Sequence, residues 1–310
     1  MRIGRAAGVT DTGRRRLRNE DAFICEPPLF AVADGMGGAR AGEIAAGLAA
    51  AALEEAGSET RGSEGVAALI VEANRRIWER SLADPATAGM GTTVTAALVD
   101  ATAGTVAIGH VGDSRAYLFR NGTLEQLTTD HSLVAELVES GVLTPEEAER
   151  HPQRSAITRA LGTEATVEVD AFTIASELGD VFLLCSDGLP TMVTDDVVAT
   201  AIETADRDPA RAAEGLVTAA NARGGEDNIT VVLFEIVEGE LSDSEPPRPA
   251  EHTVVKSTPE TSTTHESQAA ASSEPLRRHG AGPGGRLTAF LLIAAVLGIA
   301  VIALYWGVTR

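Results

Sequence analysis

Five acidic motifs, spread from residue 16 to residue 228, each stand beside an apolar run of the chain. They are, in order, Arg16-Leu17-Arg18-Asn19-Glu20-Asp21, Asp34-Gly35-Met36-Gly37-Gly38, Gly112-Asp113-Ser114-Arg115, Ser186-Asp187-Gly188 and Glu226-Asp227-Asn228. Apolar runs such as residues 29–33 and 181–185 are typical of buried strands. An Asp that follows such a run is held in position by the strand but faces a cleft at its end. Carboxylates gathered in this way repel one another unless a divalent ion neutralises them. A single Asp-Gly pair is ordinary turn chemistry, whereas five motifs in this order predict a site for hard cations.

The elements that must position these residues alternate between strands and pairs of helices. Strand patterns cover residues 2–9, 22–25, 29–33, 92–99, 105–111, 115–120, 166–174, 181–185 and 229–237, and helical patterns cover residues 41–56, 62–82, 195–204 and 208–222. Asn121-Gly122 predicts a tight hairpin, and Asp208-Pro209 predicts a helix start with an N-cap and a first-turn proline. Thr144 and Glu147 have capping-box spacing. The order predicts two packed, mainly antiparallel sheets with a helix pair on each outer face.

The charge of the chain argues against nucleic acid as a partner. The formal net charge is −20, and residues 1–238 alone carry 38 acidic residues against 19 arginines, which gives −19. A phosphate backbone needs a basic footprint that this balance does not supply. Most of the acidity fits a solvated surface, and part of it fits metal ligands.

The two cysteines, Cys25 and Cys185, lie in apolar runs. They fit buried small hydrophobes in a reducing compartment better than a disulfide or a nucleophile. Residues 1–20 are rich in arginine and have no apolar h-region, so we expect no N-terminal signal peptide.

The composition changes after residue 238. Six of the 13 prolines and 12 serine or threonine residues fall between residues 242 and 283, with few large apolar residues. Such a segment cannot bury enough surface to fold, so residues 239–286 are predicted to be a disordered linker after a catalytic domain at 1–238.

Residues 287–306 are 20 consecutive uncharged residues, the length of a membrane-spanning helix. A buried core helix is the alternative, but after a disordered linker it would have nothing to pack against. Arg277, Arg278 and Arg286 precede this segment and only Arg310 follows it, so the tail 307–310 should lie outside the cell. We therefore expect a single-pass protein of the inner (cytoplasmic) membrane with a cytoplasmic catalytic domain.

The ordered motifs of residues 1–238 closely resemble the bacterial metal-dependent serine/threonine phosphatases of the protein phosphatase 2C (PPM) family. Besides the acidic clusters, the resemblance includes Gly8-Val9-Thr10-Asp11-Thr12-Gly13, Gly91-Thr92-Thr93, Asp130-His131-Ser132-Leu133, His151-Pro152-Gln153-Arg154-Ser155 and Thr158-Arg159-Ala160-Leu161-Gly162. It implies an α+β fold, an α-β-β-α sandwich, with the metals in a cleft at one edge. The stretch around residues 132–151 corresponds to the family's flap.

The resemblance also implies a ligand set for two ions. Asp21 would bridge the ions, Glu20 would hold a metal-bound water, and Arg16 would bind the phosphate. The inner shells would be completed, directly or through waters, by Asp34, the carbonyl of Gly35, Asp187 and Asp227. All the ligands are oxygens, so Mn²⁺ or Mg²⁺ is expected rather than zinc. Two such ions would activate the attacking water and clamp the phosphate.

Two departures from the family pattern concern the proton donor and a third ion. Met36 stands where many eukaryotic members have a general-acid histidine, so the proton would come from metal-bound water or a nearby histidine. His131 and His151 fit structural or flap residues better than an acid. Bacterial relatives often bind a third ion through the residues matching Asp113 and Asp187 and an Asp four residues further on, which here is Thr191. A third ion should therefore be weak, and Asp113 has the alternative of pairing with Arg115 or capping a turn.

The sequence therefore predicts a metal-dependent protein serine/threonine phosphatase that opposes a serine/threonine kinase at the membrane. Its partners would be phosphorylated proteins. Two alternatives remain, a catalytically silent membrane-tethered module that binds phosphoproteins and a phosphatase for anti-sigma antagonists. Silent copies typically lose the aspartates corresponding to Asp21, Asp34, Asp187 and Asp227.

Overall fold

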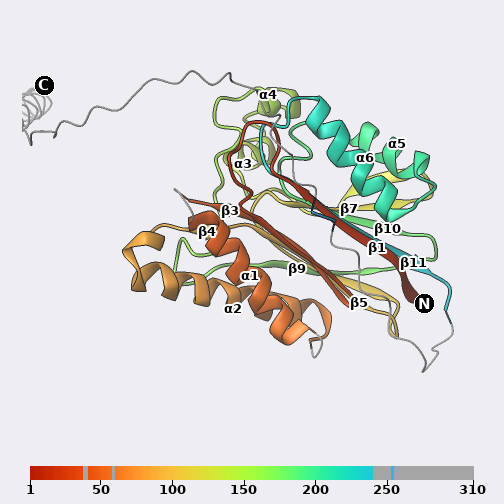
Figure 1. The fold of residues 1–310 in the computed structure, drawn as a ribbon, viewed down its shortest axis with the longest axis horizontal. Helices are drawn as coiled ribbons and strands as arrows, with labels where there is room; N and C mark the ends of the chain where they lie inside the picture. The colour runs from red at the N-terminus through yellow and green to blue at the C-terminus, as the bar shows by residue number, and fades with distance from the viewer. Residues whose placement is uncertain (38–40, 58–59, 240–252, 255–310) are drawn as a thin grey trace, which may run out of the picture. The chain divides into compact units, whose positions relative to one another are not determined.

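The structure is a computed structural model that describes residues 1–37, 41–57, 60–239 and 253–254, all within a unit that spans Met1–Pro259. Two sheets form its centre (Figure 1). The first sheet has the order β12 (Thr253–Val254), β1 (Arg2–Asp11), β11 (Ile229–Val237), β10 (Val181–Cys185), β7 (Arg115–Arg120) and β8 (Thr123–Gln126). The second has the order β2 (Asp21–Glu26), β3 (Leu29–Met36), β5 (Val94–Asp100), β6 (Thr105–Val111) and β9 (Asp170–Ala175), with β4 (Gly91–Thr92) on β3. All these pairs are antiparallel except the parallel pair of β1 and β12.

A pair of helices covers the outer face of each sheet (Figure 1). Helices α1 (Ala41–Gly57) and α2 (Gly62–Ala83) pack on the second sheet, and α5 (Asp195–Thr204) and α6 (Pro209–Ala222) lie on the first. Three short helices complete the described part of the chain: η1 (Pro85–Thr87), α3 (Leu133–Glu139) and α4 (Pro145–Glu149). The predicted sandwich with a helix pair on each outer face is confirmed.

The core between the sheets is aromatic and aliphatic. Phe234 of β11 stacks on Phe30 of β3 with ring centroids 4.1 Å apart and on Phe182 of β10 at 5.0 Å. All three rings are fully buried, and stacked rings add to the free energy of burying their area. The sheets therefore give the loops at their edge a rigid base.

Local turn and cap chemistry follows the sequence closely. Asp208 caps α6 by accepting a hydrogen bond from the Arg211 backbone, with Pro209 in the first turn. Thr144 and Glu147 form the predicted capping box of α4. The hairpin between β7 and β8 turns at Asn121 and Gly122, both with positive φ, as its tight turn requires.

Two predicted strands differ from the structure. Residues 92–99 form two strands because Thr93 leaves the ladder, its hydroxyl accepting from the Asp34 backbone N–H and contacting Ser114. Strand β9 begins at Asp170 rather than at residue 166, since β6 pairs with it only from Asp170 onward.

The segments predicted to follow the domain lie almost entirely outside the described residues. Thr253 and Val254 fall within the predicted linker and pair with Val9 and Thr10 of β1. The predicted membrane span at 287–306 and the tail 307–310 lie outside the described part of the chain. Among the residues that the structure does describe, no helix is both long and apolar enough to cross a bilayer.

Candidate metal centre

Two predicted ligands face each other across neighbouring strands. Asp21, the first residue of β2, pairs directly with Asp34 near the end of β3. Residues paired in this way project from the same face of the sheet with their Cβ atoms about 4.5–5.5 Å apart, and like charges there are destabilising. The register alone therefore creates a position of high negative charge.

Asp187 joins this pair from the other sheet. It follows β10 after Ser186, whose hydroxyl donates to Asp21 Oδ2 at 2.9 Å. The Thr230 hydroxyl on β11 donates to the same oxygen at 2.6 Å. Both donors fix one oxygen of Asp21, which leaves the other oxygen available for a different partner.

Two carboxylate oxygens at this junction are buried and unpartnered. Asp21 Oδ1 and Asp187 Oδ1 are enclosed and have no hydrogen-bond partner, although each residue as a whole is partly exposed. A buried oxygen without a partner carries a desolvation penalty of about 1–3 kcal/mol, more when it is charged. Such oxygens are expected where a ligand supplies the missing interaction.

The electrostatics of these carboxylates favour a cation. Burial, and then the charge of Asp187, raises the pKa of Asp21 to about 7, against the hydrogen bonds from Thr230 and Ser186. Burial and then Asp227 raise the pKa of Asp187 to about 6. Burial and the charges of Asp21 and Asp187 raise the pKa of Asp34 well above its ordinary value. A neighbouring positive charge would stabilise the ionised form of each of these carboxyl groups and lower its pKa.

The donor set fits divalent Mn or Mg ions, which prefer oxygen ligands. The carboxylates do not form a ready-made cage, because no three His, Cys, Asp or Glu side chains of the described residues are grouped tightly enough to enclose an ion. The fit therefore rests on the unpartnered buried oxygens and on the mutual repulsion of the carboxylates.

Glu20 and Gly35 lie beside Asp21 and Asp34. Burial raises the pKa of the Glu20 carboxyl, partly opposed by the charge of Arg16. Gly35 has no room for a side chain, since a Cβ there would lie 2.2 Å from the Gly42 carbonyl oxygen and 2.5 Å from that of Glu20. Backbone from β3, α1 and the β1–β2 loop is therefore closely packed at Gly35.

Asp113 is 8% exposed and follows β6. Burial, then Asp187 and Asp130, raise its pKa to about 7. Its alternative partner Arg115 instead forms a two-pronged ion pair with Asp130, at 2.8 and 2.7 Å. Asp113 is thus left without that ion pair, and Thr191 is exposed, its backbone N–H donating to the Asp187 carbonyl.

Arg16 lies against the last of the acidic motifs. Its Nη2 donates to Asp227 Oδ2 at 2.5 Å. The loop is anchored by Asn228, whose Nδ2 donates to the carbonyls of Thr12 and Arg18 and whose Oδ1 accepts from the Glu20 backbone. The β1–β2 loop and the α6–β11 loop are therefore held together beside the carboxylates.

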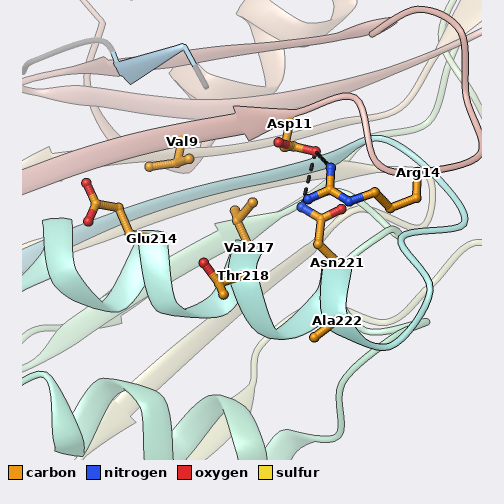
Figure 2. Close-up of a pocket in the computed structure, with 8 residues that line it drawn as sticks. All are labelled: Val9, Asp11, Arg14, Glu214, Val217, Thr218, Asn221 and Ala222. Atoms are coloured by element: carbon orange, nitrogen blue, oxygen red, sulfur yellow. Dashed lines mark hydrogen bonds and ion pairs between the residues drawn. The ribbon is translucent and has the colours of Figure 1, made fainter. Parts of the chain in front are cut away.

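Asp11, the last residue of β1, holds the start of the β1–β2 loop through hydrogen bonds (Figure 2). Asp11, 3% exposed, accepts from the backbone of Gly13 at 2.8 Å, from Asn221 Nδ2 at 3.1 Å and, at 3.5 Å, from Arg14. Gly13 has φ +77, and a Cβ there would lie 2.1 Å from the Asp227 carbonyl oxygen, so only glycine fits. A hollow of about 510 Å³ lies between β1 and α6 at this point, and none of the predicted metal ligands lines it.

The described histidines serve structural contacts. His110 is fully buried and bonds Thr95 and the Thr129 carbonyl. His131 Nδ1 accepts from the Gly112 backbone, and its Nε2 lies 3.2 Å from Asp170. His151 Nδ1 accepts from the Gln153 backbone. The prediction of structural roles for His131 and His151 agrees with these bonds.

Several supporting residues were not assigned a role from the sequence: Ser186, Asn228, Thr230, Thr93 and Asp130. Ser186 and Asn228 stand inside the quoted acidic motifs, which is the one sequence signal they carry. Thr230 is brought to the site by the pairing of β11 with β10, and no local pattern marks it. Asp130 and Thr93 stand in quoted motifs, but only the fold shows that Asp130 pairs with Arg115.

Known proteins match this chain over the region that carries the site. The protein-family profile described as protein phosphatase 2C matches residues 13–217. The serine/threonine phosphatase stp of Listeria welshimeri is 42% identical over 243 residues, covering 73% of this chain and 93% of that protein.

Two solved structures share the fold. The serine/threonine phosphatase PstP/Ppp of Mycobacterium tuberculosis is similar with a TM-score of 0.71 and 38% identity, covering 76% of this chain and 100% of that one. The catalytic domain of the phosphatase PstP in complex with two manganese ions has a TM-score of 0.69 and 37% identity, covering 76% and 99%.

Proposed function

The chain belongs to the protein phosphatase 2C family and is a metal-dependent protein serine/threonine phosphatase, and from that premise we propose which of its residues carry the reaction. The proposed ligands of two divalent ions are Glu20, Asp21, Asp34, Gly35 through its carbonyl, Asp187 and Asp227. The observation that supports them most directly is the pair of unpartnered buried oxygens on Asp21 and Asp187. The structure of PstP with two manganese ions supports the same number here.

The carboxylates hold charge in place rather than react. Two bound divalent ions would supply an activated water and offset the negative charge of the phosphoryl group. Ser186 and Thr230 hold Asp21 through its Oδ2, which leaves Oδ1 as the oxygen that would bind an ion. Fixing one oxygen in advance lowers the reorganisation that binding would otherwise require.

Arg16 would hold the phosphate of the substrate. Its guanidinium contacts Asp227 through one nitrogen, and a planar guanidinium has further donors that match two phosphate oxygens. Asn228 and Asp11 fix the backbone of the loop, so the guanidinium is held at the edge of the carboxylate cluster.

The leaving oxygen of serine or threonine would take its proton from solvent. Met36 has no proton to donate, and His110 and His131 are engaged with Thr95, Thr129, Gly112 and Asp170. No side chain with a free acidic proton is thereby assigned to this step.

Hydrolysis of a phosphothreonine peptide by the purified chain tests the assignment. Activity should require added Mn²⁺ or Mg²⁺ and be lost on chelation, and Asp21→Ala should lower kcat/KM by orders of magnitude. The matched control is Asp100→Ala, because Asp100 caps the β5–β6 turn through Thr102 and Ala103. An Asp21→Ala protein that is folded and fully active would refute the ligand set.

We also propose that a third ion binds weakly beside Asp113 and Asp187, because Thr191 supplies no charge. The substitution Thr191→Asp adds a hard ligand, so it should tighten one Mn²⁺ site in calorimetric titration. Equal affinity and stoichiometry in both proteins would contradict this proposal.

The placement of the enzyme follows from the segment after the domain. The uncharged segment 287–306 and the arginines before it support a membrane tether with the catalytic domain in the cytoplasm. Its substrates would then be proteins phosphorylated by a serine/threonine kinase at the same membrane. Protease added to intact spheroplasts should leave the domain uncut, and digestion from outside would reverse this topology.

A further inference from the structure

The loop between β1 and β2 concentrates positive charge in an acidic domain. Four of the 19 arginines of residues 1–238 fall within five positions, Arg14, Arg15, Arg16 and Arg18 around Leu17. All five residues are exposed, and Leu17 is 99% exposed. This loop therefore presents a basic surface directly beside the carboxylate cluster.

Two of these arginines are engaged and two are free. Arg14 contacts Asp11 and Arg16 contacts Asp227. Within the described residues, the guanidinium groups of Arg15 and Arg18 have no hydrogen bond and no ion pair, and Arg18 feels only the longer-range charge of Glu20. Arg15 and Arg18 can thus accept a partner without first breaking an ion pair.

The backbone beneath the two free side chains is fixed. The backbone N–H groups of Arg14 and Arg15 donate to the Gly225 carbonyl, at 2.7 and 3.3 Å. At the other end of the loop, Asn228 donates to the Arg18 carbonyl at 2.8 Å. Binding would therefore cost mainly the rotamer freedom of two side chains, and not the ordering of a loop.

The two free arginines flank the proposed phosphate ligand. Arg15 is adjacent to Arg16, and Arg18 is two residues beyond it. An extended substrate advances about 3.3–3.6 Å per residue. The long side chains of Arg15 and Arg18 can thus reach substrate side chains within about three residues of the phosphorylated one.

We propose that Arg15 and Arg18 determine substrate specificity by pairing with acidic side chains within three residues of the phosphorylated serine or threonine. This inference rests on the proposed role of Arg16 as the phosphate ligand. The −19 charge of residues 1–238 would by itself attract basic peptides. Charges more than about 8 Å away are largely screened at physiological salt, so contact with the loop decides the preference.

Matched phosphothreonine peptides test the proposal on the full chain with Mn²⁺. One peptide has glutamates at the two positions before the phosphothreonine and the two after it, and the other has glutamines there. The wild-type chain should hydrolyse the glutamate peptide with a kcat/KM higher by about two- to fivefold for each arginine engaged, as expected for exposed ion pairs. Raising the salt concentration should reduce the ratio.

The double substitution Arg15→Gln with Arg18→Gln should remove this preference. Leu17→Gln is a control for the shape of the loop, because it changes a neighbouring exposed residue and no charge. Arg211→Gln is a control for net charge, because Arg211 is exposed in the first turn of α6. Both controls should keep the wild-type ratio.

The outcomes separate this inference from the proposed function. Equal rates for the two peptides on the wild-type chain overturn the inference while leaving phosphatase activity in place. A preference that survives in the double variant, or that is lost equally in Leu17→Gln or Arg211→Gln, also overturns it. If the chain with Mn²⁺ hydrolyses neither peptide and also fails to hydrolyse p-nitrophenyl phosphate, the proposed function itself is refuted.

Discussion

Strand β10 (Val181–Cys185) has an aspartate near each end, and the two have different surroundings. Asp180 comes just before the strand and is 1% exposed. It accepts two hydrogen bonds from Arg120, at 2.8 and 2.6 Å, and one from the Glu177 backbone at 2.7 Å. Its charge is thus paired and its oxygens are satisfied.

Asp187 follows the same strand after Ser186, and one of its carboxylate oxygens has no hydrogen-bond partner. Its Oδ1 is buried without a partner, and burial and then the charge of Asp227 raise the pKa of its carboxyl, partly opposed by a hydrogen bond with Asp34. A buried carboxylate that is fully bonded stabilises a fold, whereas one held among like charges costs stability unless a ligand binds. The difference shows that two aspartates beside one strand can differ in whether their oxygens have partners, which is the basis on which Asp187, and not Asp180, is proposed as a metal ligand.

The largest expected contrast is in activity. Asp187→Asn should lower kcat/KM with Mn²⁺ by about three orders of magnitude, more than the 10–100-fold typical of losing a supporting partner of a metal site. Asp180→Asn should stay within about threefold, because Asp180 lies at the other end of β10 from the proposed ligands and its partners are Arg120 and the Glu177 backbone. Initial rates on a phosphothreonine peptide measure both. Similar losses of activity in the two variants would contradict the proposal that Asp187 is a metal ligand and Asp180 is not.

The second contrast is in stability. Asp180→Ala removes a buried carboxylate that accepts hydrogen bonds from Arg120 and from the Glu177 backbone, so it should destabilise the chain by about 1–3 kcal/mol, while Arg120 keeps its ion pair with Glu177. Asp187→Ala should cost far less in the presence of chelator, since it removes a repelled carboxylate. Urea unfolding followed by circular dichroism measures both, with Arg120→Gln as the partner control. A larger loss at Asp187 than at Asp180 would contradict the assignment.

The smallest contrast is in the dependence of stability on pH. The pKa of Asp34 in the folded chain is raised by burial and neighbouring carboxylates, so the folded state holds this proton at a pH where the unfolded state has released it. Stability therefore falls as pH rises from the unfolded pKa through the folded one. In chelator, Asp34→Asn should therefore be more stable than the wild type at pH 8, and the difference should be much smaller at pH 4.

The measurement is the difference in unfolding free energy between the two proteins at several pH values. Asp170 is the matched control, because hydrogen bonds from His131 and Arg159 lower the pKa of this carboxyl. Asp170→Asn should therefore lose stability relative to the wild type as pH rises. The same sign for both variants would argue against the difference between paired and unpaired carboxylates.

The sequence by itself was sufficient for most of the helices and strands and for the family. Alternating apolar runs, the Asn121-Gly122 turn and the Asp208-Pro209 helix start are local patterns, and the structure has strands, hairpin and helix where they predicted them. Cys25 and Cys185 are free and buried, as their apolar neighbours indicated. The motifs and their order also indicated the family, because both can be read from the sequence without knowing its three-dimensional structure.

Only the tertiary structure decided which carboxylates have partners. Asp180 and Asp187 both stand next to the same apolar run, and the motif Ser186-Asp187-Gly188 singles out Asp187 without showing which of the two carboxylates has a partner. The partner of Asp180 is Arg120, 60 residues away, whereas the donors to Asp21 are Ser186 and Thr230, 165 and 209 residues away. Likewise, Arg115 takes Asp130 rather than Asp113 because β7 brings those two side chains together. Electrostatic pairing depends on distance in space, and that distance is fixed by strand register and sheet packing.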